Sequence, residues 1–185
     1  GYCGVGSESI LIDKNSKIQK DCSVKENLEI DFFTLLNFNS LPLSSLMIVN
    51  NGLLFNEGNE FLAVEDFDLQ INLVKSFKNP LLKIGSSLIY YRINTKNRNS
   101  GLQQKKNSFK VIEKYKDDMP ASLYRIIYQR INYRVGKIEL FNRNYSSSSK
   151  FFINALMIKQ FPTKIFFKSM AGFFLSKLRL KNIYK

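Results

Sequence analysis

The sequence contains no histidine, and this absence excludes several classes of active site. Without an imidazole there is no His-based catalytic triad and no His-ligated zinc site. The chain has two cysteines, Cys3 and Cys22, which are too few for a disulfide framework or a cysteine-ligated metal centre. A reducing cytoplasm suits such a chain best.

Long apolar runs and an amino-terminal targeting pattern are also missing. The apolar pieces within residues 151–185 are interrupted by lysines and fall well short of the ~18–20 residues that span a bilayer. The chain begins with Gly1 and shows no signal-peptide layout. We therefore expect a cytoplasmic chain, peripheral on the inner face of the cell membrane where it meets lipid, and the later part of a longer polypeptide.

The net charge of +13 is concentrated in the second half of the chain. Residues 1–100 carry 10 Lys and Arg against 11 Asp and Glu, a net of −1, whereas residues 101–185 carry 18 against 4, a net of +14. This asymmetry predicts a near-neutral domain followed by a basic part that meets an anionic surface. The predicted organisation is a domain at 1–100, a basic helical segment at 101–145, a serine-rich linker at 146–150 and a basic amphipathic tail at 151–185.

The spacing of apolar residues predicts an α/β fold for the first hundred residues. An uninterrupted apolar run at 46–49 is typical of a strand buried on both faces. The other expected elements are strands at 2–12, from 18 onward and at 81–93, helices at 29–38 and 64–77, and two further helices at 103–116 and after Pro120.

An acidic cluster begins the helix expected at 64–77. Asp66 could project into a cleft and accept a proton from a hydroxyl nucleophile. Alternatively, Glu65, Asp66 and Asp68 only complement the dipole of a surface helix. The cluster alone favours the second interpretation, because acidic first turns are common.

The order of motifs around this cluster changes that balance. Paired serines precede an apolar run, a Phe-Asn-Glu turn follows, a Glu-Asp pair starts a helix, and a strand ends in Tyr-Arg before a polar loop. These residues are Ser44-Ser45, Phe55-Asn56-Glu57, Glu65-Asp66 with Asp68-Leu69, Tyr91-Arg92 and the loop that closes at Ser100. Across roughly residues 2–100, this succession resembles the second half of family 2 glycosyltransferases.

The resemblance implies part of a GT-A-like mixed sheet flanked by helices and followed by a basic helical extension. It implies transfer of a sugar from a nucleotide-sugar donor to a hydroxyl acceptor, glycan or lipid-linked, in cell-surface polysaccharide or glycan synthesis, inverting by direct displacement. Asp66 would be the general base, and Glu65 would support it or contact the acceptor.

Five residues would contact substrate under this resemblance: Ser44, Ser45, Asp68, Arg92 and Ser100. Arg92 suits a diphosphate because its guanidinium pairs with phosphate oxygens, although a salt bridge to a nearby carboxylate is an equal alternative. The family often has a His after Tyr-Arg, where this chain has Ile93 and Asn94.

The nucleotide-binding half and the Asp-any-Asp metal motif of the family would lie before Gly1. We therefore expect a divalent metal, Mg or Mn, for the full-length enzyme, with ligands mostly outside this chain. The 185-residue chain alone is expected to be inactive.

The tail predicts contact with a membrane through Lys164, Phe167, Lys168, Phe174 and Lys177. Aromatic residues on one side of a helix with flanking lysines suit an interfacial helix on anionic lipid. The alternative is a helix packed on the domain, with its lysines extended to water.

A non-enzymatic basic module that binds anionic membrane or nucleic acid is the competing function. Tyrosines and arginines interleave at 124–134, a pattern that can bind single strands. No recognised nucleic-acid motif accompanies them, so nucleic acid is not the expected partner.

Overall fold

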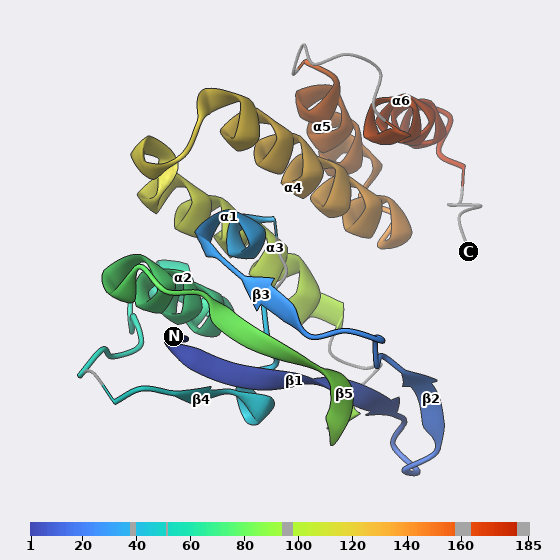
Figure 1. The fold of residues 1–185 in the computed structure, drawn as a ribbon. Coiled ribbons are helices and arrows are strands. Elements are labelled where there is room, and N and C mark those ends of the chain that lie inside the picture. The colour runs from blue at the N-terminus through green and yellow to red at the C-terminus, as the bar shows by residue number, and fades with distance from the viewer. Residues whose placement is uncertain (38–39, 51, 94–97, 158–163, 181–185) are drawn as a thin grey trace. The chain divides into compact units, whose positions relative to one another are not determined.

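The computed structural model describes residues 1–37, 40–50, 52–93, 98–157 and 164–180, without the side chains of 98–101. The chain divides into two compact units, Gly1–Arg98 and Asn99–Lys185. The first unit is a mixed, curled sheet flanked by helices, and the second is helical (Figure 1). The predicted α/β class of the first hundred residues is therefore confirmed.

Two parallel strands form the centre of the sheet in the first unit. β1 (Gly4–Ile12) pairs in parallel with β5 (Leu81–Arg92), and the chain between them includes α2 (Glu65–Phe77). β2 (Ile18–Asp21) is antiparallel to β1 on one side, and β3 (Leu28–Ile30) is antiparallel to β5 on the other. The strand order is therefore β2-β1-β5-β3.

α2 forms where the apolar spacing predicts it. Phe67, Ile71 and Val74 are buried along one side of the helix, and the burial of this apolar side stabilises it. Lys78 ends the helix in the left-handed conformation, with φ of 54°, and Pro80 follows two residues later.

The prediction of a helix at 29–38 is partly wrong. Leu28–Ile30 form β3, and the helix α1 spans only Phe32–Leu36. The Asp31 side chain sets this start, because it accepts a hydrogen bond of 2.7 Å from the Thr34 amide.

The prediction of a strand buried on both faces at 46–49 is also wrong. β4 (Met47–Ile48) is antiparallel to the start of β1, and Met47 is 70% exposed. A two-residue strand paired beside Gly4 is covered on neither face, so its apolar composition does not report burial here. Gly4 permits the pairing, since a Cβ at that position would lie 2.8 Å from the Met47 carbonyl oxygen.

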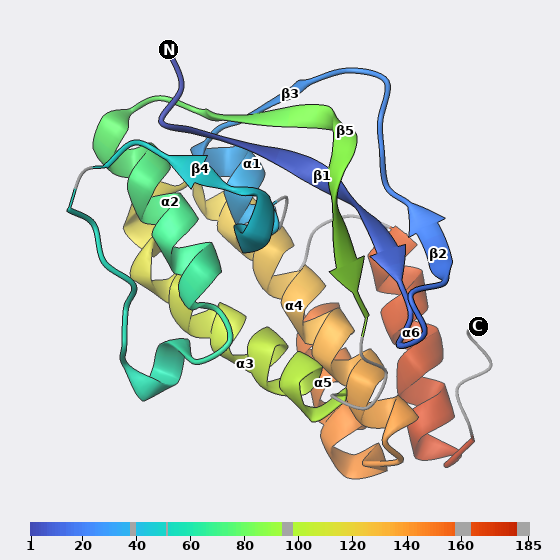
Figure 2. The same ribbon diagram turned by 90° about the horizontal axis from the view of Figure 1, so that it is seen from below.

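The second unit consists of α3 (Arg98–Lys114), α4 (Ala121–Phe141), α5 (Tyr145–Leu156) and α6 (Lys164–Lys177). α4, α5 and α6 are neighbours, as Figure 2 shows. Phe152 of α5 is buried at their junction, where a Cβ on Gly136 or Gly172 would come within 3.1 Å or 2.4 Å of its ring. Both glycines therefore bring α4 and α6 close to the ring of α5.

The predicted serine-rich linker at 146–150 is wrong, because these residues lie inside α5. Ser148 is fully buried: its hydroxyl bonds to the Gly136 carbonyl oxygen at 2.8 Å and lies 2.9 Å from the Ser176 hydroxyl. Small hydroxyl side chains can pack between helices when their polar atoms find such partners. The predicted tail from residue 151 is likewise divided, since 151–156 complete α5 and α6 begins at Lys164.

Candidate functional site

The acidic start of α2 is the candidate site of the first unit. Glu65 and Asp66 are both partly buried, and Asp66 Oδ1 accepts a hydrogen bond of 2.8 Å from the Phe67 amide. Burial raises the pKa of Asp66, and the neighbouring Glu65 carboxylate raises it further, against the lowering effect of the Phe67 amide. A carboxylate with a raised pKa accepts a proton more readily, as a general base must.

The backbone before this pair of acids is strained. Ala63 has φ of 66°, a left-handed conformation that is uncommon for a residue with a Cβ. Buried Phe61 and Val64 hold the chain on either side of it. Such strain persists only where the surroundings enforce it, and it concentrates at functional sites.

Glu65 shows a second departure from ordinary packing. Its Oε2 atom is buried and has no hydrogen-bond partner within the described part of the chain. A buried carboxylate oxygen is costly to leave unpaired. The start of α2 therefore contains two partly buried carboxylates, and one oxygen of Glu65 has no partner among the described residues.

Two buried contacts hold the serine-bearing segment against α2 and β1. Gln70 of α2 clamps Leu41, whose amide donates to Gln70 Oε1 at 2.8 Å while Gln70 Nε2 donates to the Leu41 carbonyl at 3.0 Å. Ser45 Oγ accepts from the Ser7 amide of β1 at 3.1 Å. The segment 41–45 is therefore fixed between helix and strand, and Gln70, which the sequence did not single out, provides half of that fixation.

The predicted serines lie in a 3-10 turn, Leu43–Ser45, that precedes β4. The Ser45 hydroxyl lies within hydrogen-bond distance of the Ser7 carbonyl at 3.1 Å and the Pro42 carbonyl at 3.0 Å, so it stabilises the turn. Ser44 is exposed. Of the pair, Ser44 is thus the one accessible to a substrate.

Asp68 and Arg92 are placed differently from the acids at 65 and 66. Asp68 is 3% exposed, which leaves little of it for a substrate. Arg92 donates to the carbonyl oxygens of Asp13 at 2.8 Å and Lys14 at 3.1 Å, and to Ser16 Oγ at 3.2 Å. Arg92 therefore closes the turn between β1 and β2 and forms no salt bridge with a carboxylate among the described residues, while its contact with a diphosphate stays a prediction.

The polar loop predicted to close at Ser100 is only partly visible. Residues 94–97 lie outside the described residues, as does the side chain of Ser100, while Arg98 begins α3. Among the described contacts, none joins Arg92 to the start of α2. The structure thus brings Ser45 and α2 into one framework and leaves Arg92 at a separate turn.

A divalent metal was predicted for the full-length enzyme, with ligands mostly outside this chain. The described residues contain no group of three or more Asp, Glu, Cys or His side chains that could hold an ion. Glu65 and Asp66 are two adjacent carboxylates and by themselves do not complete an octahedral shell. We derive no step through a metal from these residues.

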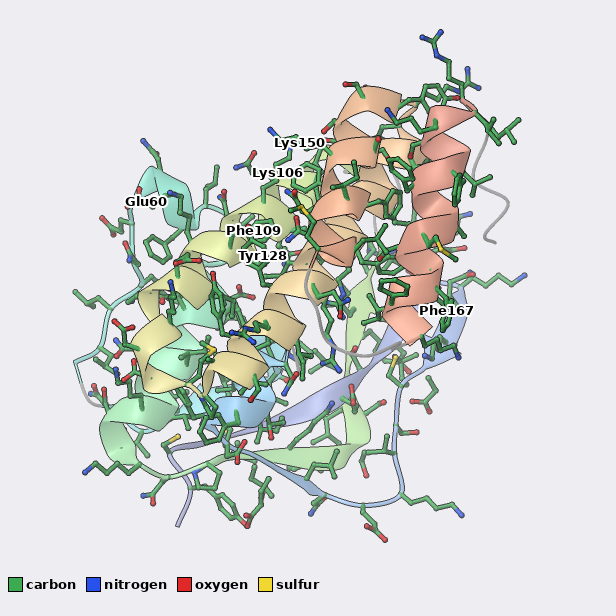
Figure 3. The ribbon with its side chains drawn as sticks, turned by 90° about the horizontal axis from the view of Figure 1, so that it is seen from above. Glu60, Lys106, Phe109, Tyr128, Lys150 and Phe167 are labelled. Atoms are coloured by element: carbon green, nitrogen blue, oxygen red, sulfur yellow. The ribbon has the colours of Figure 1, made fainter. Side chains whose placement is uncertain are left out.

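α6 of the second unit buries small residues and exposes large apolar ones, which is the reverse of the usual arrangement. Its buried residues are small: Ser169, Gly172 and Ser176. Its exposed apolar residues are large: Phe167 (54% exposed), Met170 (40%), Phe174 (56%) and Leu178 just beyond its end (66%). Figure 3 shows Phe167 near the start of α6. No helix in the described ranges is long and apolar enough to cross a membrane.

The lysines predicted to contact a membrane flank this apolar face. Lys164 and Lys177 are exposed, and Lys168 is partly buried. Phe166 and Phe173, which the sequence places on the same side as the exposed residues, are partly buried instead. They contact Phe167 and Phe174 edge to face, with ring centroids 5.8 Å and 5.7 Å apart.

The tyrosines of α4 pack within the second unit. The ring centroid of Tyr128 lies 5.1 Å from that of Phe109 and 5.8 Å from that of Tyr124. Figure 3 shows Phe109 beside Tyr128. Burial raises the pKa of Tyr124, as does its hydrogen bond to Glu113. These rings therefore contact one another within the second unit, and the expectation about nucleic acid stays a prediction.

A hollow of about 440 Å³ at the α5–α6 contact was missed by the sequence reasoning. It is lined from α5 by hydroxyls and Lys150, and from the end of α6 by Lys177 and the following Arg179. A helix through the serine run was the signal that could have found it, because only a helix places residues 146, 149, 150 and 153 on one face.

Searches of protein-family models, curated proteins and solved structures found nothing that matches this chain.

Proposed function

We propose that the chain is the acceptor-side part of a family 2-type glycosyltransferase, which transfers a sugar from a nucleotide-sugar donor to a hydroxyl acceptor. The observation that supports this most is Asp66, which has a raised pKa and lies at the helix start that directly follows strained Ala63. The ordered motifs from Ser44 to Arg92, on a mixed sheet flanked by helices, support it further. A GT-A-like architecture is part of the same proposal.

In this reaction Asp66 acts as the general base. The acceptor oxygen attacks the anomeric carbon of the donor, and the bond from that carbon to the nucleoside diphosphate breaks with its electron pair. The acceptor proton passes to Asp66 Oδ2, the oxygen that does not accept from the Phe67 amide. Burial is the main cause of the raised pKa of Asp66, and the Glu65 charge raises it further, so Glu65 acts through Asp66 as a positioning residue. Groups for the diphosphate and a divalent metal are not assigned to this chain.

The test compares Asp66→Asn with Glu60→Gln in the protein expressed from the complete reading frame. Glu60 is an exposed carboxylate in the 3-10 turn just before α2, and it serves as the matched control. Release of nucleoside diphosphate is measured over a panel of nucleotide sugars with Mg or Mn. We expect Asp66→Asn to lower kcat by about 10²–10⁴-fold and Glu60→Gln to leave it unchanged.

Two results would contradict the proposal. Wild-type kcat in Asp66→Asn, with unchanged circular dichroism, would remove Asp66 from the mechanism. A wild-type protein that releases nucleoside diphosphate from no donor of the panel would remove the glycosyltransferase itself.

A second function is favoured by α6: peripheral binding to an anionic membrane surface. Its exposed apolar face (Phe167, Met170, Phe174 and Leu178) lies in the part of the sequence with a net charge of +14. Apolar side chains can enter the headgroup region while each nearby Lys or Arg contributes about 1 kcal/mol on anionic lipid. Such binding would suit a lipid-linked acceptor, and it is also what the non-enzymatic alternative requires.

A vesicle-pelleting assay separates the two contributions. Changing Lys164, Lys168 and Lys177 to Glu should abolish pelleting on anionic vesicles, and Phe167→Ser with Phe174→Ser should weaken it at every salt concentration. Electrostatic binding falls as salt rises, whereas sugar transfer should be far less sensitive. Unchanged pelleting in both variants would rule out α6 as the contact.

A further inference from the structure

We propose that the hollow at the α5–α6 contact of the second unit is a binding site for a phosphate group. Its volume of about 440 Å³ lies in the usual range for small-ligand sites. It is lined by Tyr145, Ser146, Ser149, Lys150, Ile153, Asn154, Ser176, Lys177 and Arg179.

The charges around the hollow are all of one sign. Lys150, Lys177 and Arg179 line it, and none of its nine residues is acidic. Three cations suit a ligand with more than one negative charge and several acceptor oxygens, which a phosphate monoester has and a carboxylate lacks. Arginine pairs two phosphate oxygens at once, and lysine adds a point charge.

The hydroxyl and amide groups of the lining complete the donor set. Tyr145, Ser146 and Ser149 contribute hydroxyl groups from α5, and Asn154 contributes an amide. Ser176 is already engaged, since its hydroxyl donates to the Gly172 carbonyl at 2.8 Å. A phosphate in the hollow would therefore meet neutral donors on α5 and cations on both helices.

The buried carboxylate of this unit does not neutralise these cations. Glu139 accepts from Asn144 Nδ2 at 2.7 Å and Ser147 Oγ at 3.0 Å, and it forms an ion pair with Lys106 at 3.2 Å. Its charge is thus satisfied by partners that do not line the hollow. Lys177 Nζ also lies over the Phe173 ring, 5.7 Å from its centroid, but no ion pair among the described residues involves the three cations of the hollow.

The backbone of Arg179 determines how this residue can be tested. Arg179 has φ of 54° just beyond α6, and the Leu180 amide closes the helix by donating to the Leu175 carbonyl at 3.0 Å. Glycine is usual at such a position, because other residues cost about 1–2 kcal/mol there. Arg179 therefore lines the basic hollow from a left-handed helix end, a position that other residues of the chain also adopt.

Arg143 is a matched control residue for substitutions of Arg179. It ends α4 in the same way, with φ of 62° and with the Asn144 amide donating to the Glu139 carbonyl at 2.9 Å. It does not line the hollow. Arg143→Gly and Arg179→Gly therefore remove the same charge and relieve the same strain, yet they differ in their relation to the site.

The position of the hollow beside α6 indicates two sources of phosphate. Lys177 lines the hollow and follows Phe174 of the exposed apolar face by three residues. A lipid headgroup phosphate would lie there if this face entered a membrane surface, and a soluble phosphate monoester would bind there without one. No residue of α2 takes part, so this proposal stands or falls independently of the glycosyltransferase proposal.

The experiment titrates the full chain and its two glycine variants with glycerol 3-phosphate, at constant ionic strength, by calorimetry and by amide chemical shifts. We expect the wild type and Arg143→Gly to bind alike, with shifts at Ser149 and Lys150, and Arg179→Gly to bind about tenfold or more weakly. Lys150→Gln should weaken binding without any backbone change, with Lys137→Gln, an exposed lysine of α4, as its control.

A second arm uses phosphatidylcholine vesicles with and without phosphatidic acid. If wild-type chain binds glycerol 3-phosphate, or binds only vesicles with phosphatidic acid, and Arg179→Gly loses that binding, the site is supported and its source identified. Equal binding by wild type, Arg143→Gly and Arg179→Gly would overturn the proposal. So would an equal loss in both glycine variants, which would indicate general charge attraction, or no binding of either ligand by the wild type.

Discussion

The two units of the chain enclose their carboxylates in opposite ways. Asp66 in the first unit accepts from one amide and lies beside another acid, so burial and Glu65 keep its pKa raised. Glu139 in the second unit is buried too, and burial alone would raise its pKa, but Asn144, Lys106 and Ser147 outweigh burial and keep it lowered. The two carboxylates therefore differ in the partners around them: Asp66 keeps a raised pKa, whereas the partners of Glu139 hold its pKa low.

Among the substitutions that test this difference, Glu139→Ala should cause the largest loss of stability. The change removes an ion pair and two hydrogen bonds that join α3, α4 and α5, and we expect a loss of about 3 kcal/mol in unfolding free energy. Urea unfolding followed by circular dichroism measures it, since the chain has no tryptophan. Asp117→Asn, an exposed acid of the same unit, should change nothing.

The stability that Glu139 contributes should depend on pH. The folded pKa of Glu139 is lowered, so its stabilisation is present above its ordinary pKa of 4.5 and disappears as pH falls through the folded value. Glu139→Gln should lack that part of the acid transition. An unaltered acid transition in Glu139→Gln would contradict the structural role.

Gly172→Ala should break the orderly packing of the second unit. The new Cβ would lie 2.4 Å from the Phe152 ring, so α6 must move away from α5. This movement would break the contact between the Ser148 and Ser176 hydroxyls. We expect a net loss of about 2 kcal/mol, after allowing for the better helix propensity of alanine.

Gly136→Ala is the graded control, because its Cβ would meet the same ring at 3.1 Å. Its loss should be smaller, and Phe152→Leu should partly rescue Gly172→Ala. Equal stability of both glycine variants and wild type would contradict the packing argument.

Much of the first unit was predictable because its signals are local. The apolar period of α2 and the strands β1 and β5 follow from neighbouring residues. The carboxylates of the candidate site were found for the same reason. The failures concern long-range partners: Arg92 binds carbonyl groups of residues 13 and 14, and Glu139 is satisfied from α3 and α5. No local pattern encodes such contacts.

The serine run shows the same limit in the second unit. Serine favours loops because its hydroxyl competes for backbone groups, and this predicts a linker at 146–150. Ser148 instead satisfies its hydroxyl on Gly136 and Ser176, which lie on two other helices. Contacts with other helices thus outweighed the local preference of serine for loops. Because the helix was not predicted, the hollow on its face was not predicted either.

Asp66→Asn should stabilise the first unit at neutral pH, opposite to the effect at Glu139. A raised folded pKa means that ionised Asp66 opposes folding, so a neutral amide should add on the order of 1 kcal/mol. The gain should be complete above the folded pKa, shrink as pH falls from that value towards the ordinary value of 3.8, and be absent below 3.8, where Asp66 is neutral in both the folded and the unfolded chain. Hydrogen exchange of the α2 amides measures it, and slower exchange in wild type than in the variant at pH 7 would contradict it.

The smallest expected effect concerns an exception within the well-satisfied second unit. Ser169 is fully buried on α6, and its hydroxyl has no hydrogen-bond partner within the described ranges of the chain. Ser169→Ala removes a polar group that was desolvated without compensation, and alanine also favours the helix, so we expect a gain of about 1 kcal/mol. Ser176→Ala is the matched control, since it deletes a hydroxyl that bonds to Gly172 and Ser148, and it should destabilise. A loss of stability in Ser169→Ala would contradict this expectation, because it would show that the buried hydroxyl stabilises the fold.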